Sequence, residues 1–166
     1  MNKSRPSAII FKSNTGHTKE YADMLGSETG LPVFSLKDAI SKVPSNSTVV
    51  YLGWIKANHI VGFSKVFKKF EISVVCGVGL CKTGTIIKET RAATKIPDSI
   101  PLYTLRGGMD YEKLKGINKL LIKMLRKATD KKSEKQYDEM SKMLLSDENY
   151  VSRENLDEVI DYISQK

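Results

Sequence analysis

A short apolar run near the N-terminus stops at a turn of small hydroxylated residues, and a helical pattern follows at once. The apolar run is Ala8-Ile9-Ile10-Phe11, the turn spans residues 13–18, and apolar residues then recur at helical spacing up to Leu25. A strand followed directly by a helix indicates an α/β fold. The N-terminus of a helix that follows such a turn binds anionic groups through backbone N–H donors and the positive end of the helix dipole.

The chemistry of this turn narrows the class of anion. Hydroxyl groups come from Ser13, Thr15 and Thr18, an amide comes from Asn14, and Gly16 allows close approach of the backbone. The turn contains neither the Gly-x-x-x-x-Gly-Lys-Ser/Thr nor the Gly-x-Gly-x-x-Gly pattern. It therefore favours a phosphate monoester over a pyrophosphate. The alternative is an ordinary capped helix, since Ser and Thr are common N-caps.

The same segment resembles the N-terminal signature of the flavodoxin family. The string Ile9-Ile10-Phe11-x-Ser13-x-x-Gly16-x-Thr18-x-x-x-Ala22-x-x-Leu25 is similar to that signature at every defined position. The resemblance implies that the turn holds the phosphate of FMN. The residues assigned to the phosphate are Ser13, Asn14, Thr15, Gly16, His17 and Thr18.

Strand-like and helical patterns alternate along the rest of the chain. The expected strands are 7–11, 32–36, 48–53, 72–77 and 101–105, and the expected helices are 18–27, 37–42, 60–70, 85–95, 111–129 and 153–164, the last capped by Ser152. This alternation predicts one flavodoxin-like domain over residues 1–166, a three-layer α/β sandwich. Its five parallel strands would run in the order 2-1-3-4-5, with ligands at the carboxyl ends of the strands. The charged segment 130–149 has no clear pattern and is expected to be a surface excursion.

The turns after the third and fourth strands are candidates for the flavin ring. The third-strand residues assigned to the ring are Gly53, Trp54, Ile55, Lys56, Ala57 and Asn58. Trp54 either stacks on the ring or closes the core. After the fourth strand, Gly79 is a weaker candidate, and residues 77–84 lack the aromatic side chain that flavodoxins commonly place there. The outer ring face would then be open, or covered by Leu80 or Tyr111.

A looser resemblance leads to the bacterial protoporphyrinogen oxidase/dehydrogenase branch of the flavodoxin superfamily. It rests on the Leu105-Arg106 turn, on the basic helix around Ile117–Met124 and on the string Val66-Phe67-Lys68-Lys69. No catalytic residue is carried over from that branch. Arg106 would either reach an anion at the sheet edge or pair with Asp110.

The chain is basic, with a net charge of +8, whereas shuttle flavodoxins are acidic. The excess of bases precedes residue 138 and gathers at residues 113–135. An apolar stripe recurs there at helical spacing between lysines, formed by Leu114, Ile117, Leu121, Met124, Leu125 and Ala128. The simplest expectation is that this apolar stripe packs on the sheet. The basic face would add contact with an anionic membrane or an acidic partner. No specific nucleic-acid binding is expected, because zinc-finger spacing and RNP-like strings are absent from the sequence.

Cysteine usage and hydropathy suggest a cytoplasmic protein, with peripheral membrane attachment as an option. Cys76 and Cys81 are neither Cys-x-x-Cys nor part of a metal-ligand set, so reduced structural thiols are expected. No apolar run reaches the roughly 20 residues that span a bilayer, and no secretory segment is evident.

These observations predict an FMN-binding redox protein that mediates electron transfer, with no catalytic side chain and no metal site. Its partner would be a redox protein or a small-molecule or quinone acceptor. Two alternatives remain open. The first is an FMN-dependent dehydrogenase or oxidase of the protoporphyrinogen type at a membrane surface, and the second is a non-redox module that has lost flavin.

Overall fold

The fold was derived from a computed structural model, which describes residues 5–129 and 147–166. The segment 130–146, most of the predicted surface excursion, lies outside the described residues. The elements in chain order are β1 (Ala8–Lys12), α1 (His17–Thr29), β2 (Val33–Ser35), α2 (Leu36–Lys42), β3 (Thr48–Lys56), β4 (His59–Ile60), α3 (Phe63–Lys69), β5 (Glu71–Gly79), α4 (Ile87–Thr94), β6 (Leu102–Arg106), α5 (Gly116–Thr129), the 3₁₀ helix η2 (Arg153–Leu156) and α7 (Asp157–Ser164).

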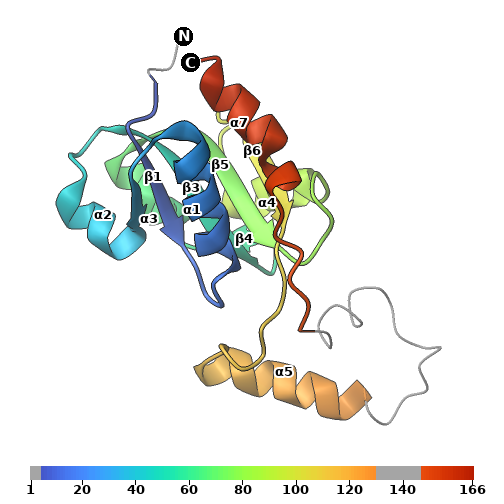
Figure 1. The fold of residues 1–166 in the computed structure, drawn as a ribbon. Helices are drawn as coiled ribbons and strands as arrows, with labels where there is room; N and C mark the ends of the chain where they lie inside the picture. The colour runs from blue at the N-terminus through green and yellow to red at the C-terminus, as the bar shows by residue number, and fades with distance from the viewer. Residues whose placement is uncertain (1–4, 130–146) are drawn as a thin grey trace.

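Five strands form a parallel sheet in the order β2-β1-β3-β5-β6 (Figure 1). Among the parallel strands alone, this is the predicted 2-1-3-4-5 path of a flavodoxin-like three-layer sandwich. The prediction missed β4, which pairs antiparallel with β3 and makes the sheet six-stranded. The order in chain numbering is therefore 2-1-3-5-6. The topological switch point, where the order in which strands are added reverses, lies between β1 and β3, as expected.

The layers follow from strands that are apolar on both faces. Successive residues of a strand point to opposite sides, so Ile9 and Ile10 of β1 enter different cores. The core containing Ile10 and Tyr51 packs against α2 and α3, and the core containing Ile9 and Val50 packs against α1 and α7. Figure 1 shows α1 and α7 on one face of the sheet and α2, α3 and α4 on the other.

The third predicted strand is longer than expected and turns back on itself. β3 continues to Lys56, and Ala57 (φ 46°) and Asn58 (φ 63°) form a two-residue turn into β4. Positive φ at both central residues is the geometry of a type I′ hairpin turn. Ile60 pairs with Ile55 across this hairpin, so α3 begins at Phe63 and not at Ile60.

The two C-terminal helices also differ from their predictions. α5 begins at Gly116 and not at residue 111, and it lies beyond the carboxyl edge of the sheet (Figure 1). Of the predicted apolar stripe, Ile117, Leu121 and Met124 are exposed, so the expectation that they pack on the sheet is wrong; the neighbouring Leu120 is exposed as well. The last helical segment starts as the 3₁₀ helix η2, where the Ser152 side chain makes no capping hydrogen bond. Within the described residues, no helix is long and apolar enough to cross a membrane.

Candidate functional site

The turn between β1 and α1 is shaped by one side-chain hydrogen bond and by a glycine at the start of the helix. The N–H of Gly16 donates to Oγ of Ser13 at 3.1 Å, and the carbonyl of Gly16 accepts from the N–H of Glu20 at 3.0 Å. Gly16 is the N-cap residue and has a φ of 113°, a conformation that glycine adopts without strain. Because glycine has no side chain, the N-cap gives no hydrogen bond to the first-turn N–H groups of α1. The ordinary capped helix of the alternative interpretation is therefore not what forms here.

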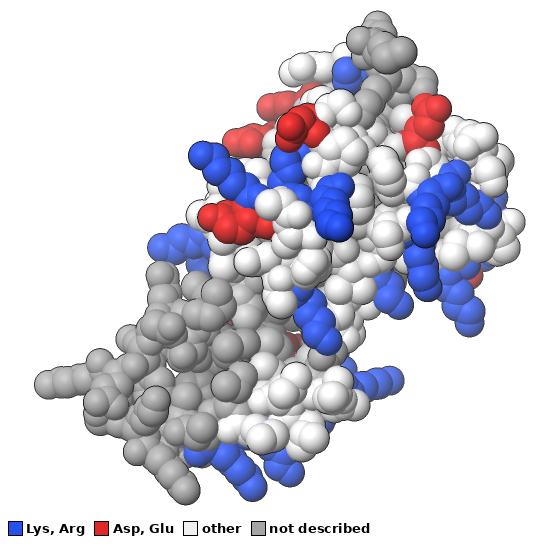
Figure 2. Space-filling view, turned by 180° about the vertical axis from the view of Figure 1, so that it is seen from behind, with Lys and Arg blue, Asp and Glu red and all other residues white. Residues whose placement is uncertain are grey.

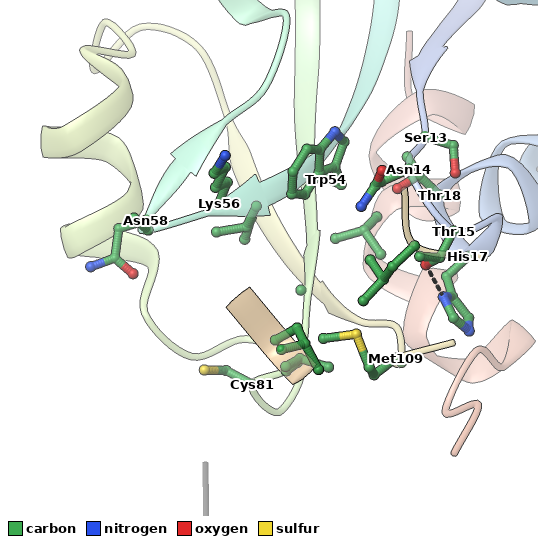
Figure 3. Close-up of a pocket in the computed structure, with 18 of the residues that line it drawn as sticks. Ser13, Asn14, Thr15, His17, Thr18, Trp54, Lys56, Asn58, Cys81 and Met109 are labelled. Carbon is green, nitrogen blue, oxygen red and sulfur yellow. Dashed lines mark hydrogen bonds between the residues drawn. The ribbon is translucent and has the colours of Figure 1, made fainter. Parts of the chain in front are cut away.

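A cavity of about 380 Å³ opens beside this turn (Figure 3). It lies at the carboxyl ends of β1, β3 and β5, the edge at which doubly wound sheets bind ligands. All but two of the residues predicted to bind a cofactor line it, namely Ser13, Asn14, Thr15, His17, Thr18, Trp54, Ile55, Lys56, Ala57, Asn58 and Gly79. Residues from three separate turns are thus brought to one site, as the sequence predicted.

Gly16 and Gly53 are the two predicted residues that do not line the cavity. Gly16 instead provides the positive-φ backbone conformation at which α1 begins. At Gly53, a Cβ would lie 2.5 Å from Cγ2 of Ile60 and 2.9 Å from the carbonyl oxygen of Val61. Glycine at this position is explained by close packing of the β3–β4 hairpin and not by approach to a ligand.

The β3–β4 hairpin carries Trp54 to the cavity. Trp54 is half-buried and belongs to neither core cluster, so it does not close the core. Figure 3 shows its ring projecting from the end of β3, between the labelled turn residues and the hairpin. The hairpin is anchored to α4, because the N–H of Ile60 donates to Oγ1 of Thr94 at 2.9 Å. Trp54 therefore lines the cavity from a hairpin that is fixed to α4 by a hydrogen bond.

The sequence interpretation missed most of the apolar wall. The further lining residues are Val78, Leu80, Cys81, Ile86, Gly108, Met109, Leu114, Leu121 and Ile122. Leu80, one predicted cover for the flavin ring, lines the cavity, whereas Tyr111, the other candidate, does not. Leu114 and Leu121 belong to the predicted apolar stripe, but they line the cavity and do not pack on the sheet as expected. Their periodicity showed an apolar side without showing what that side faces.

Electrostatically, the turn at the start of α1 is close to neutral. Oγ1 of Thr15 lies 3.0 Å from Nδ1 of His17. Burial lowers the pKa of His17 below 6.5; Glu20 and Asp110 oppose this shift, and Lys113 adds to it. His17 is therefore neutral at pH 7. An anion bound here would depend on N–H groups, hydroxyls and the helix dipole.

Arg106 does not pair with Asp110, which was one of its two predicted roles. Its guanidinium lies 3.6 Å from the centroid of the Tyr150 ring, a cation–π contact. Asp110, the predicted partner, instead pairs with Lys113 at 2.8 Å. Arg106 thus ties the end of β6 to the segment that precedes η2.

A polar network beside the site joins four segments that are distant in sequence. The phenol of Tyr21 donates to the carbonyl of Arg106 at 2.5 Å, and Nδ2 of Asn155 donates to that phenol at 2.7 Å. Oγ1 of Thr83 lies 2.7 Å from Oδ1 of Asn155 and accepts from the N–H of Arg106 at 3.0 Å. The network connects the β5–α4 loop, which contributes Leu80 and Cys81 to the cavity, to α1 and β6.

Metal ligation has no support in the part of the chain that the structure describes. No group of three or more His, Cys, Asp or Glu residues is arranged there to hold a metal ion. Cys76 is buried and Cys81 is half-buried, and neither forms a disulfide among the residues that the structure describes.

Comparison with known proteins gives little further information. No protein-family model matches the chain, and no curated protein matches it by sequence. A solved structure of a hypothetical protein from Neisseria gonorrhoeae with bound ppGpp is similar at 16% identity, covering 61% of this chain and 69% of that one, with a TM-score of 0.39. A likeness this partial transfers neither a ligand nor an activity.

Proposed function

We propose that the protein binds FMN non-covalently and transfers electrons through it. The proposal rests on one observation. The N-terminus of α1, which has no side-chain cap, lies beside a largely apolar cavity. A volume of about 380 Å³ lies within the roughly 300–1,000 Å³ range of small-molecule and cofactor sites. A phosphate monoester suits the turn, and a planar aromatic ring suits the apolar part.

The residues present fit the two ends of this cofactor. Ser13, Thr15 and Thr18 supply hydroxyl groups for the phosphate, and the first-turn N–H groups of α1 add donors and a favourable dipole. Trp54, Leu80 and Met109 supply apolar contacts for the ring. Bound FMN would supply one- or two-electron chemistry, while the protein positions it and tunes its electrostatic environment. The redox partner would be another protein or a small-molecule or quinone acceptor.

One observation favours an enzyme as a second candidate. Leu121 and Ile122 of α5 form part of the cavity wall, where no aromatic residue of the 77–84 loop covers the site. An apolar wall of this kind suits a second apolar ring beside the flavin. This arrangement supports an FMN-dependent dehydrogenase or oxidase of the protoporphyrinogen type. Turnover of protoporphyrinogen with a quinone acceptor would distinguish the enzyme from an electron carrier.

The deciding experiment compares FMN with riboflavin, which lacks the phosphate. Trp54 is the single tryptophan of the chain and lines the cavity, so a flavin bound there should quench its fluorescence. FMN should bind more tightly than riboflavin. Thr15→Ala combined with Thr18→Ala should weaken FMN binding by about tenfold or more, at ~1 kcal/mol for each hydrogen bond lost.

Riboflavin makes no phosphate contact, so the double variant should bind it as the wild type does. Unchanged riboflavin affinity would show that the cavity of the variant is intact. Ser27→Ala with Thr29→Ala removes two hydroxyls from the opposite end of α1 and serves as the matched control. Equal affinity for FMN and riboflavin would contradict the phosphate assignment. A colourless protein that binds neither flavin would overturn the proposal and leave the non-redox module.

A further inference from the structure

The α5 helix presents an apolar face to solvent. Ile117, Leu120 and Met124 are 68%, 55% and 61% exposed. Their spacing of three and four residues places them on one side of the helix. A single exposed apolar residue is common on protein surfaces, but a contiguous exposed row indicates an interaction site. We call this row the α5 face.

The polar side of the same helix is basic. Lys115 precedes the helix, and Lys119, Lys123 and Lys127 follow at intervals of four residues. The α5 sequence contains no Asp or Glu. Lys119 lies 3.5 Å from Glu112, whereas Lys115, Lys123 and Lys127 have no acidic partner among the described residues. In Figure 2, lysines border the white surface at the lower end of the molecule, where Figure 1 places α5.

We propose that α5 docks on the surface of an anionic lipid bilayer. An apolar row beside a row of lysines is the arrangement of an interfacial helix, which inserts its apolar side at the boundary between headgroups and acyl chains. The lysines would then lie near the lipid phosphates and be attracted to the negative surface potential. The charge also disfavours a second copy of this chain as the occupant, because two α5 faces in contact would bring their lysine rows together.

Docking through α5 would also set the position of the cavity. Leu121 and Ile122 line the cavity, and both belong to the helix that carries the α5 face. A docked helix would therefore place one cavity wall at the lipid surface. The inference does not require flavin, since it rests on the exposure and charge of α5 alone.

Vesicle co-sedimentation of the full chain tests the inference. The protein should pellet with phosphatidylcholine vesicles that contain phosphatidylglycerol, and pure phosphatidylcholine should retain far less of it. Changing Ile117, Leu120 and Met124 to Ser should lower the partition coefficient about tenfold or more, since three exposed apolar side chains no longer insert. Changing Lys115, Lys123 and Lys127 to Gln should lower it to a similar degree and reduce the salt dependence.

Two matched controls separate α5 from general basicity. Ile40→Ser with Phe67→Ser removes exposed apolar side chains elsewhere, and changing Lys37, Lys65 and Lys68 to Gln removes the same charge from α2 and α3. Both controls should bind vesicles like the wild type.

Absence of wild-type binding, or equal loss in the α5 and control variants, would overturn the inference. Light scattering that shows a wild-type dimer converted to a monomer by the α5 Ser variants would overturn it in favour of self-association. Flavin absorbance is measured separately, so failure here leaves the FMN proposal unaffected.

Discussion

The hydroxyl oxygen of Thr15 lies 3.0 Å from Nδ1 of His17, within the turn that opens the cavity. Burial lowers the pKa of His17, so the imidazole ring at this turn is uncharged in the ligand-free protein at neutral pH. A phosphate brought next to this ring would favour its protonated form. Binding of an anion at this turn would therefore be coupled to protonation of His17.

The first prediction concerns this coupling. FMN or inorganic phosphate should raise the pKa of His17, and their affinity should increase as the pH falls through it. NMR titration in His59→Gln measures the effect cleanly, because His17 is then the single histidine of the chain. A His17 pKa that stays the same when FMN is bound would contradict a phosphate at this turn.

The same shift affects the stability of the ligand-free protein. Because the folded pKa of His17 lies below 6.5, its contribution to stability is complete above that pH and is lost as the pH falls through the folded pKa. Replacing His17 by Asn should flatten the pH dependence of the free energy of unfolding in this range. Urea denaturation at a series of pH values measures the slope, and His59→Asn is the control.

Thiol reactivity should distinguish the two cysteines. Burial raises the pKa of Cys76 to about 12, whereas Cys81 is half-buried and lines the cavity. A disulfide reagent should therefore modify one thiol in the folded protein and both after denaturation. The Cys81→Ser variant retains Cys76 and should be modified slowly while it is folded. FMN should protect Cys81, and a reaction rate independent of FMN would place the flavin elsewhere.

The hairpin turn contains a residue that is not suited to it. Ala57 has a φ of 46°, where an L-residue with a Cβ is disfavoured by roughly 1–2 kcal/mol. Ala57→Gly should raise the free energy of unfolding by about 0.5–1 kcal/mol, after the greater freedom of the unfolded chain is subtracted. Ala92→Gly, at an exposed position in α4, should lower it by a similar amount. Chemical denaturation of both variants checks the opposite signs.

The polar network around Tyr21 should contribute to stability through coupled hydrogen bonds. Asn155→Ala removes the donor to the Tyr21 phenol and leaves the Thr83 hydroxyl without its amide partner, so a loss of about 1–3 kcal/mol is expected. Tyr21→Phe should cost a comparable amount. In a double-mutant cycle the two losses should not add, with a coupling of roughly 0.5–3 kcal/mol. Additive losses would show that the two side chains act independently.

Local sequence determined the parts of the molecule in which neighbouring residues interact. Ile9 and Ile10 require burial on both faces of a sheet, and Gly16 provides the backbone freedom at which α1 begins. Alternation of strands and helices then leaves few topologies for a parallel sheet, so the strand path and the edge that holds the cavity were predictable. This is why the turns at residues 13–18 and 54–58 could be assigned to one site.

The β4 hairpin was missed because its turn sequence is weak and one of its supporting contacts is distant in the sequence. Ala57-Asn58 is a weak turn sequence, and the residues after it read as the start of a helix. Ile60 joins the sheet because it pairs with Ile55 and because Thr94 of α4 accepts a hydrogen bond from its N–H. Ile55 is close to Ile60 in the sequence, but Thr94 is 34 residues away and is not visible in a short window.

The turn of hydroxylated residues at the start of α1 was determined by the sequence alone, since a strand, a glycine and a helix N-terminus are specified by residues close together in the chain. The walls of the cavity and the exposure of α5 were decided by the tertiary structure. Periodicity places Leu114 and Met124 on the apolar side of one predicted helix, but it does not show that Leu114 is buried at the cavity while Met124 faces solvent. That difference depends on where the chain between β6 and α5 places the helix relative to the sheet, which is a long-range property of the fold.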